Sequence, residues 1–189
     1  MRVTFVTGNK GKLHEAQVAL APLGHEVVAA DLHPVEIQAE TLEEVSRAKC
    51  EVLVGKLPPP FFVDDGGLFV DALKGFPGVF SAHALKRIGS AGILKLMEGV
   101  EERGAHFACV VTYYDGERVR SFAGRCDGRI AREARSSGHG FGFDPIFVPD
   151  GHERTFGELP AEVKNDLSHR GKALAQLVAH LRGRNVPPA

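Results

Sequence analysis

Four stretches of the sequence combine residue types that could carry out chemistry. The first is residues 7–12, where glycines, Asn9 and two lysines follow a short apolar segment. A loop of this kind between a strand and a helix presents backbone N–H groups and the positive end of the helix dipole, which favour a phosphate group. Lys10 and Lys12 add positive charge. The P-loop spacing is absent, so a tight turn with solvated lysines remains an equal alternative.

The second stretch is the acidic pair Asp64 and Asp65, which is followed by two glycines. We expect the pair at the end of a short buried strand over residues 61–63, where two carboxylates are costly unless a cation lies beside them. Mg²⁺ takes hard oxygen ligands, often one or two carboxylates together with substrate phosphates. Glu36, between apolar neighbours, is a candidate for a further acidic ligand. A simple turn at Asp65 and a surface position for Glu36 are the alternatives.

The third stretch is a glycine-rich loop over residues 138–145 that carries Phe141, Phe143 and Asp144. Glycines allow a backbone to approach a flat ligand closely, and an exposed aromatic ring gives a base a surface on which to stack. A loop whose phenylalanines belong to the core is equally consistent with the sequence.

The fourth stretch contains Lys164 and then Ser168, His169 and Arg170. Ser168 is a good N-cap for the last helix, which places His169 and Arg170 in its first turn. Cations are unfavourable at that end of the helix dipole. The mismatch indicates an anionic or carbonyl-rich ligand nearby.

Alternating strand and helix patterns surround these stretches. Strand patterns cover residues 2–6, 25–30, 61–63 and 146–148, and the segments 106–114 and 117–125 flank Asp115-Gly116 as a hairpin with a two-residue turn. Helix patterns cover residues 13–23, 41–56, 89–99 and 168–181, the second of them opened by a capping box of Thr41 and Glu44. We expect disorder only in the last few residues, through Pro187-Pro188. With no internal repeat and no linker, the chain is predicted to be one α/β folding unit with a mixed sheet.

Composition excludes several other classes of protein. The 189 residues are 43% hydrophobic with a net charge of −1, so no basic surplus indicates a nucleic-acid partner. The three cysteines are widely spaced, which argues against a disulfide framework or a zinc ribbon. Neither a membrane-spanning segment nor a signal peptide is visible. We therefore expect a cytoplasmic protein with no membrane partner.

Taken together and in this order, the motifs resemble those of the inosine/xanthosine triphosphate pyrophosphatase family, the Ham1-type enzymes that remove non-standard purine nucleotides. The resemblance runs from Val3 to Leu181 and rests on Thr7-Gly8-Asn9-x-x-Lys12, Glu36, Asp64-Asp65-x-Gly67-Leu68, Gly75-x-Pro77-Gly78-Val79-x-Ser81-Ala82, Phe141-Gly142-Phe143-Asp144-Pro145 and Lys164-Asn165-x-x-Ser168-His169-Arg170. The segments 36–38 and 42–45 resemble the archaeal branch. Two departures stand out: Gly66 replaces the usual Ser or Thr, and His83 and Leu85 replace the usual residues after Ser81-Ala82.

The resemblance implies an α/β fold of two lobes around a long curved mixed β-sheet with flanking helices, residues 1–189 forming one domain with the active-site cleft between the lobes. It implies a homodimer that hydrolyses ITP, dITP or XTP to the monophosphate and pyrophosphate with Mg²⁺, which Mn²⁺ can replace. Asp65 would be the catalytic proton acceptor, and Glu36 and Asp65 would hold the metal, with Asp64 nearby as a candidate ligand. Substrate binding would fall to Thr7, Gly8, Asn9, Lys10, Gly11, Lys12, Lys49, Gly66, Phe141, Gly142, Phe143, Asp144, Lys164, His169 and Arg170.

Asp65, the base that the resemblance implies, would be mostly unable to accept a proton at neutral pH with an ordinary pKa. A carboxylate with an ordinary pKa of about 4 is a poor base there, so Asp65 would rely on a metal that polarises the water or on neighbouring carboxylates that raise its pKa. A broader nucleoside triphosphate pyrophosphatase, a phosphohydrolase that releases orthophosphate and a nucleotide-binding module without turnover are the alternative functions. The products of the reaction distinguish them.

Overall fold

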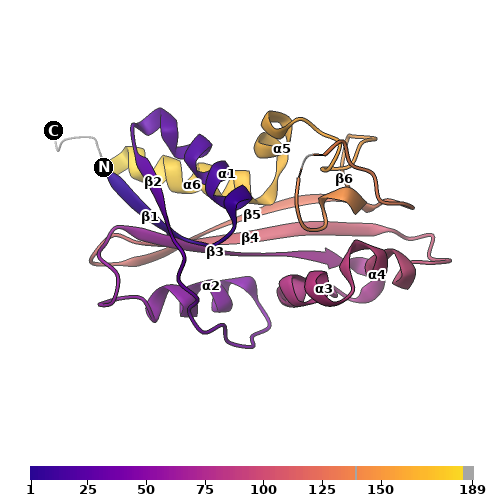
Figure 1. Ribbon diagram of the computed structural model, residues 1–189, viewed down its shortest axis with the longest axis horizontal. Coiled ribbons are helices and arrows are strands. Elements are labelled where there is room, and N and C mark those ends of the chain that lie inside the picture. The colour runs from indigo at the N-terminus through magenta and orange to yellow at the C-terminus, as the bar shows by residue number, and fades with distance from the viewer. Residues whose placement is uncertain (139, 185–189) are drawn as a thin grey trace. The chain divides into compact units, whose positions relative to one another are not determined.

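The computed structural model describes residues 1–138 and 140–184, so His139 and the tail predicted to be disordered lie outside the described part. The strands are β1 (Arg2–Val6), β2 (Glu26–Ala30), β3 (Phe61–Val70), β4 (Gly104–Tyr114), β5 (Val119–Ile130) and β6 (Phe147–Pro149). The α-helices are α1 (Lys10–Leu20), α2 (Leu42–Glu51), α3 (Ser81–Arg87), α4 (Gly89–Leu96), α5 (Ala161–Leu167) and α6 (His169–Arg184) (Figure 1). None of the described helices is long and apolar enough to cross a membrane.

The strands form one mixed sheet, as predicted, in the order β2-β1-β3-β4-β5-β6. The β1 strand pairs in parallel with both β2 and β3, whereas β5 and β6 are antiparallel. The chain divides into two compact units, and β3, β4 and β5 each contribute residues to both. Unit 1 contains Met1–Asp65, Cys109–Gly124 and the chain from Arg170, and unit 2 contains Gly66–Ala108 and Arg125–His169.

Unit 1 has an apolar cluster on each face of its strands. On one face, Phe62 of β3 packs with residues of α1 and α6, among them Leu20 and Leu177. On the other face, Phe61 and Val63 pack with Cys50 and Leu53 at the end of α2. Figure 1 shows α1 and α6 on one side of these strands and α2 on the other. Since successive side chains of a strand point to opposite faces, the sequence Phe61-Phe62-Val63 supplies both clusters.

Unit 2 has a single core cluster that is rich in aromatic rings. Phe107 of β4 lies edge-on to Phe147 of β6, with ring centroids 4.7 Å apart, and Phe147 lies 5.1 Å from Phe156. Ile93 and Met97, predicted as the apolar side chains of a helix over residues 89–99, join this cluster from α4 and the residue after it.

The main error of the sequence analysis concerns β3, which was expected to end at Val63. The strand continues through Asp64, Asp65 and two glycines to Val70. Gly67 is not a turn residue: a Cβ there would lie 2.2 Å from the carbonyl oxygen of Gly78. The glycine therefore permits a close backbone approach inside an extended strand.

Smaller differences concern element ends. The capping box of Thr41 and Glu44 is confirmed at the start of α2. The helix ends at Glu51 and not near Lys56, because the chain tightens into turns before Gly55, whose φ is 78°.

The hairpin loop spans residues 115–118 and is longer than predicted. The Asp115 carboxylate accepts hydrogen bonds from two backbone N–H groups of this loop. The short helices α3 and α5 were not predicted.

Candidate active site

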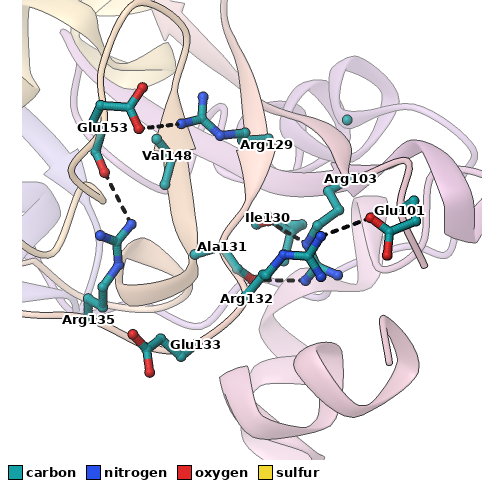
Figure 2. A pocket seen from close by; sticks show the side chains of 11 residues that line it. Glu101, Arg103, Arg129, Ile130, Ala131, Arg132, Glu133, Arg135, Val148 and Glu153 are labelled. Carbon is teal, nitrogen blue, oxygen red and sulfur yellow. Dashed lines mark hydrogen bonds and ion pairs between the residues drawn. The ribbon is translucent and has the colours of Figure 1, made fainter. Parts of the chain in front are cut away.

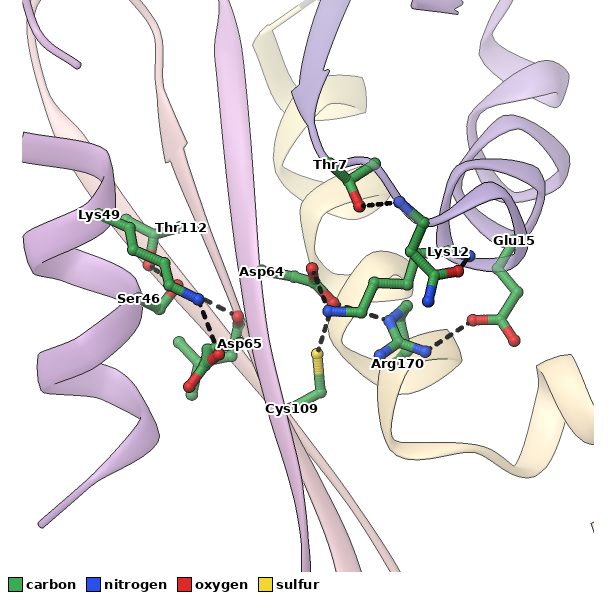
Figure 3. A network of polar contacts seen from close by, with 12 residues as sticks. Thr7, Lys12, Glu15, Ser46, Lys49, Asp64, Asp65, Cys109, Thr112 and Arg170 are labelled. Carbon is green, nitrogen blue, oxygen red and sulfur yellow. Dashed lines mark hydrogen bonds and ion pairs between the residues drawn. The ribbon is translucent and has the colours of Figure 1, made fainter. Parts of the chain in front are cut away.

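Asp64 and Asp65 are adjacent in the middle of β3 and point to opposite faces of the strand. Asp64 contacts residues of α1 and α6, whereas Asp65 contacts a residue of α2. Figure 3 shows β3 passing between the two sets of side chains. The structure thus places the two carboxylates in separate polar groups and does not bring them together as the single acidic pair that the sequence suggested.

The Asp64 carboxylate is buried between two cations. Its Oδ1 accepts a hydrogen bond from Lys12 Nζ at 2.9 Å, and its Oδ2 accepts one from Arg170 Nε at 2.8 Å (Figure 3). The Cys109 thiol lies 3.8 Å from Oδ2. Burial alone would raise the pKa of Asp64, but Lys12 and Arg170 outweigh it and hold the pKa well below its usual range. Asp64 is therefore an anion at neutral pH that fixes two basic side chains.

Arg170 lies in the first turn of α6, as predicted, and its place there is explained by two carboxylates. Besides Asp64, its Nη1 donates a hydrogen bond to Glu15 Oε2 of α1 at 2.9 Å. Burial would lower the pKa of Arg170, but Asp64 and Glu15 contribute to raising it. Glu15 was not among the predicted site residues, although a glutamate three residues after Lys12 on the same helix faces the same way.

The loop after β1 forms the start of α1. Asn9 is the N-cap, and its side-chain oxygen accepts a hydrogen bond from the Lys12 backbone N–H at 3.0 Å. The Asn9 N–H donates to Thr7 Oγ1 at 3.1 Å. Gly8 approaches Asp31 so closely that a Cβ would lie 2.6 Å from a carboxylate oxygen. The predicted loop residues thus surround a helix N-terminus, with Lys10 exposed and Gly11 partly buried in its first turn.

On the other face of β3, Asp65 and Glu36 both contact the ammonium group of Lys49. Lys49 Nζ lies 2.9 Å from Asp65 Oδ1, and Glu36 Oε1 forms a second ion pair with the same nitrogen. Burial raises the pKa of Asp65 in spite of the opposing effect of Lys49. Burial also acts to lower the pKa of Lys49, but Asp65 and Glu36 together raise it. Asp65 is thus a stronger base than an ordinary aspartate.

The position of Lys49 is set by a buried hydroxyl contact that no sequence pattern indicated. Ser46, one turn earlier on α2, hydrogen-bonds with Thr112 of β4 at 2.8 Å and donates to the Val110 carbonyl oxygen. Both hydroxyl-bearing residues are fully buried. This contact fixes α2 against β4 on the face that carries Asp65.

The predicted residues of unit 2 form a second polar group around Asp144. Its Oδ2 accepts hydrogen bonds from Lys164 Nζ and from the Phe141 backbone N–H, both at 2.7 Å. Lys164 Nζ also lies 4.4 Å from the centroid of the Phe141 ring. Gly142, with a φ of 66°, provides the left-handed turn between Phe141 and the next phenylalanine.

Phe143 and His169, the other two ring-bearing residues predicted to bind substrate, are both buried, and the binding role of His169 stays a prediction. Phe143 is only 3% exposed and belongs to the core of unit 2, so the prediction that its ring is open to a base is wrong. His169 is buried, and its ring stacks on Phe107 with centroids 4.6 Å apart and an interplanar angle of 9°.

Comparisons with known proteins identify the family of the chain. A family model described as the Ham1 family matches residues 3–180. The chain belongs to the Ham1 family. Over 182 residues it is 53% identical to the dITP/XTP pyrophosphatase of Thermococcus kodakarensis, covering 96% of this chain and 98% of that protein. It is 49% identical to the dITP/XTP pyrophosphatase of Pyrococcus horikoshii, covering 92% and 93%. Both organisms are archaea, in line with the predicted branch.

Solved structures of the Ham1 family share the fold. The Ham1 protein of Staphylococcus aureus superposes with a TM-score of 0.84 at 28% identity, covering 98% of this chain and all of that one. A nucleoside-triphosphatase / dITP/XTP pyrophosphatase of Mycobacterium abscessus gives a TM-score of 0.72 at 35% identity, covering 94% and 98%. The predicted α/β class with a mixed sheet and flanking helices is confirmed.

Two oxygen donors of this Ham1 protein suit a divalent cation. Glu36 and Asp65 converge on one positive charge, and hard cations such as Mg²⁺ bind one or two carboxylates and complete their shell with water and substrate phosphates. Within residues 1–138 and 140–184, no three His, Cys, Asp or Glu side chains are grouped to hold a metal. Asp64 faces away from this pair, so it is not a third ligand beside them. Gly66 follows Asp65 in β3.

Proposed function

We propose that this Ham1 protein hydrolyses non-standard purine nucleoside triphosphates, namely dITP, XTP and ITP, to the monophosphate and pyrophosphate. The observation that carries the proposal is the pair Asp65 and Glu36 on Lys49: a partly buried carboxylate with a raised pKa next to a second carboxylate and a lysine. The names of the archaeal relatives support the choice of substrate.

The reaction is a displacement at the α-phosphorus. The oxygen of a water molecule bonds to this phosphorus while the bond to the bridging oxygen breaks, and pyrophosphate leaves. Asp65 accepts the proton of the water, a role that its raised pKa supports. Lys49, held beside Asp65, offers positive charge to the phosphate oxygens.

The N-terminus of α1 is the proposed binding site for the phosphate chain. Backbone N–H groups at the start of a helix bind anions, and the Thr7 and Asn9 contacts hold this turn in place. Lys10 and Lys12 would add charge. Lys12 is 22% exposed at its side chain while paired with Asp64, so it can reach a ligand without leaving its partner.

The metal belongs to the proposal as well. Glu36 and Asp65 would hold Mg²⁺ or Mn²⁺, which when bound neutralises charge that develops on the phosphates and polarises the attacking water. Two protein carboxylates leave coordination positions for substrate oxygens.

For the base, we propose Phe141 as the stacking surface in place of the buried Phe143. Phe141 is half-buried, and the Asp144 contacts fix both its backbone and Lys164 beside its ring. Asp144, Lys164, His169 and Arg170 remain proposed contacts or supports of the nucleoside. Phe143 supports the loop from the core.

A homodimer is supported by large apolar side chains that are exposed on the helical segment of unit 2. Phe80, Leu85, Ile88 and Leu96 are between 37% and 50% exposed, and a group of exposed apolar residues of this kind suits a protein interface. Sedimentation velocity tests the proposal, with a single dimer species as the expected result. The cytoplasmic location is likewise a proposal, which fractionation of cells would test.

The decisive experiment is turnover of a panel of dITP, XTP, ITP, GTP and ATP, with pyrophosphate, orthophosphate and monophosphate measured separately. We expect pyrophosphate and monophosphate in equal amounts, with dITP, XTP and ITP preferred. Orthophosphate as the first product would indicate a phosphohydrolase, and tight binding without products would indicate a binding module. Either result would overturn the proposal.

A further inference from the structure

Unit 2 contains a cavity of about 540 Å³ that shares no described residue with the proposed active site. It lies where β4 begins and β5 ends, next to β6, and four arginines and three glutamates are among its lining residues (Figure 2). The volume lies in the usual range for small-molecule sites. Val148 and Ile130 give the cavity buried apolar side chains between the charged groups.

Arg103 is a fixed cation in this cavity. Its guanidinium donates four hydrogen bonds, all to backbone carbonyl oxygens, with those of Ile130 and Ala131 at 2.8 Å. These bonds hold the side chain in place, but carbonyl oxygens do not neutralise its charge. Burial, and next the nearby Arg132 guanidinium, lower the pKa of Arg103, whereas the Glu101 carboxylate acts to raise it. Arg103 and Arg132 therefore repel each other at this side of the cavity, and Glu101, which pairs with Arg132, offsets part of the repulsion. An anion of higher charge in the place of Glu101 would offset more of it.

Two of the other guanidinium groups, those of Arg129 and Arg132, have exposed carboxylate partners that are easily displaced. Arg135 instead lies 3.7 Å from the Glu158 carboxylate, whose side chain is 23% exposed. Arg132 pairs with Glu101 at 2.9 Å, and the two side chains are 71% and 79% exposed. Arg129 pairs with Glu153 at 3.3 Å, and Glu153 is 94% exposed. Exposed ion pairs of this kind contribute little to stability. Each carboxylate can turn into solvent and leave its arginine to a ligand.

The arginines lie on two sides of the cavity. Arg129 and Arg135 both contact residue 153, through its carboxylate and its backbone oxygen respectively, while Arg103 and Arg132 lie on the side of Glu101 (Figure 2). The planar guanidinium binds phosphate oxygens bidentately. A ligand with several linked negative groups can replace Glu101 and Glu153, the two glutamates paired with Arg132 and Arg129, at once, which a single carboxylate cannot do.

We propose that this arginine cavity is a second anion site, which binds a phosphoanhydride chain away from the proposed active site. Released pyrophosphate and the triphosphate chain of a nucleotide share this chemistry. Arg129 and Arg132 are the displaceable contacts, and Arg103 is the fixed charge.

Isothermal titration calorimetry of the full chain with inorganic pyrophosphate tests the proposal, with a nucleoside triphosphate as a second titrant to separate the two sources. Both titrations are run in EDTA, and unchanged triphosphate is verified at the end, which shows that no pyrophosphate formed in the cell. In the variant Arg129→Gln/Arg132→Gln we expect this site to bind about tenfold more weakly or worse, since hydrogen bonds to charged groups are lost. The matched control is Arg47→Gln/Arg125→Gln, which removes two arginines from exposed ion pairs outside the cavity. The control should bind as the wild type does.

For a second variant we expect the opposite change in affinity, that is, tighter anion binding. Glu101→Gln/Glu153→Gln removes the competing carboxylates and should tighten binding. Equal affinity and stoichiometry in the wild type, the arginine variant and the glutamate variant would overturn the proposal. Lys10→Ala, at an exposed lysine of the proposed phosphate site, distinguishes the two sites. It should weaken binding at the proposed active site and leave the arginine cavity unaffected, so failure of the proposed function would not be mistaken for failure of this one.

Discussion

Asp64 and Asp65 are consecutive residues of β3 whose carboxylates serve opposite faces of the strand. Asp64 forms ion pairs with Lys12 and Arg170, and its pKa is lowered. Asp65 forms an ion pair with Lys49, which also pairs with Glu36, and the pKa of Asp65 is raised. Strand alternation thus separates a carboxylate that holds the structure together from one that is suited to accept a proton.

The isosteric variants Asp64→Asn and Asp65→Asn should therefore fail in different ways. Asp64→Asn leaves Lys12 and Arg170 without their shared anion, and losing one partner of a buried ion pair costs about 3–5 kcal/mol of unfolding free energy. Asp65→Asn should change the unfolding free energy by less than half as much but lower kcat at least ~10²-fold, as expected for loss of a general base. Urea unfolding and steady-state kinetics on both variants give the comparison. A folded Asp65→Asn enzyme with near-normal kcat would refute the assignment.

The pH dependence of stability should reflect Asp64. Its pKa is lower when folded than the value of about 3.9 in the unfolded chain. Between these two pKa values the unfolded state binds more protons than the folded state. The stabilisation that the ionised Asp64 contributes is therefore complete above about pH 5, and it is lost as the pH falls through the pKa of Asp64 in the folded state. The difference in unfolding free energy between wild type and Asp64→Asn should stay constant from pH 7 to 5 and shrink below about pH 4. A difference that stays constant to pH 2.5 would contradict this.

Turnover should require a divalent metal, and the concentration of metal required should depend on Glu36. After exhaustive EDTA treatment we expect no turnover, with recovery on adding Mg²⁺ or Mn²⁺ and poor recovery with Ca²⁺, which prefers a larger oxygen shell. Glu36→Gln should raise the Mg²⁺ concentration for half-maximal activity about tenfold or more, because a charged ligand is lost. Glu40→Gln, an exposed glutamate of the same segment, is the control and should behave like the wild type. Full activity without any metal would rule out this role.

Alanine substitutions of the two phenylalanines in the glycine-rich loop should affect different quantities: substrate binding for Phe141 and protein stability for Phe143. Phe141→Ala should raise KM about tenfold for all purine substrates, since stacking on a base is worth roughly 1–3 kcal/mol. Phe143→Ala should instead lower the unfolding free energy by about 3–5 kcal/mol, as for other buried phenylalanines. Kinetics with dITP, XTP and ITP and thermal unfolding of both variants test the pair. The assignment fails if Phe143→Ala gives the larger change in KM in a protein of normal stability.

The sequence by itself determined much of the local structure, and the family. The strand over residues 2–6, the capping box of Thr41 and Glu44 and the Ser168–His169 helix start depend on neighbours a few residues apart and were predicted at their observed positions. The helix predicted over residues 13–23 is observed as α1, three residues earlier at each end. The order of the motifs was sufficient to indicate the Ham1 resemblance without any coordinates.

Only the tertiary structure decided what the charged residues contact. The two glycines after Asp65 suggested a turn, because the close approach of Gly67 to Gly78 is a long-range contact with no local signal. Arg170 looked misplaced at a helix N-terminus until the fold brought Asp64 and Glu15 to it from 106 and 155 residues away in the chain. The roles of Asp64 and Phe143 were likewise set by the face on which each side chain is buried. Burial and ion pairing are properties of neighbours in space, and the spacing of residues along a chain does not specify them.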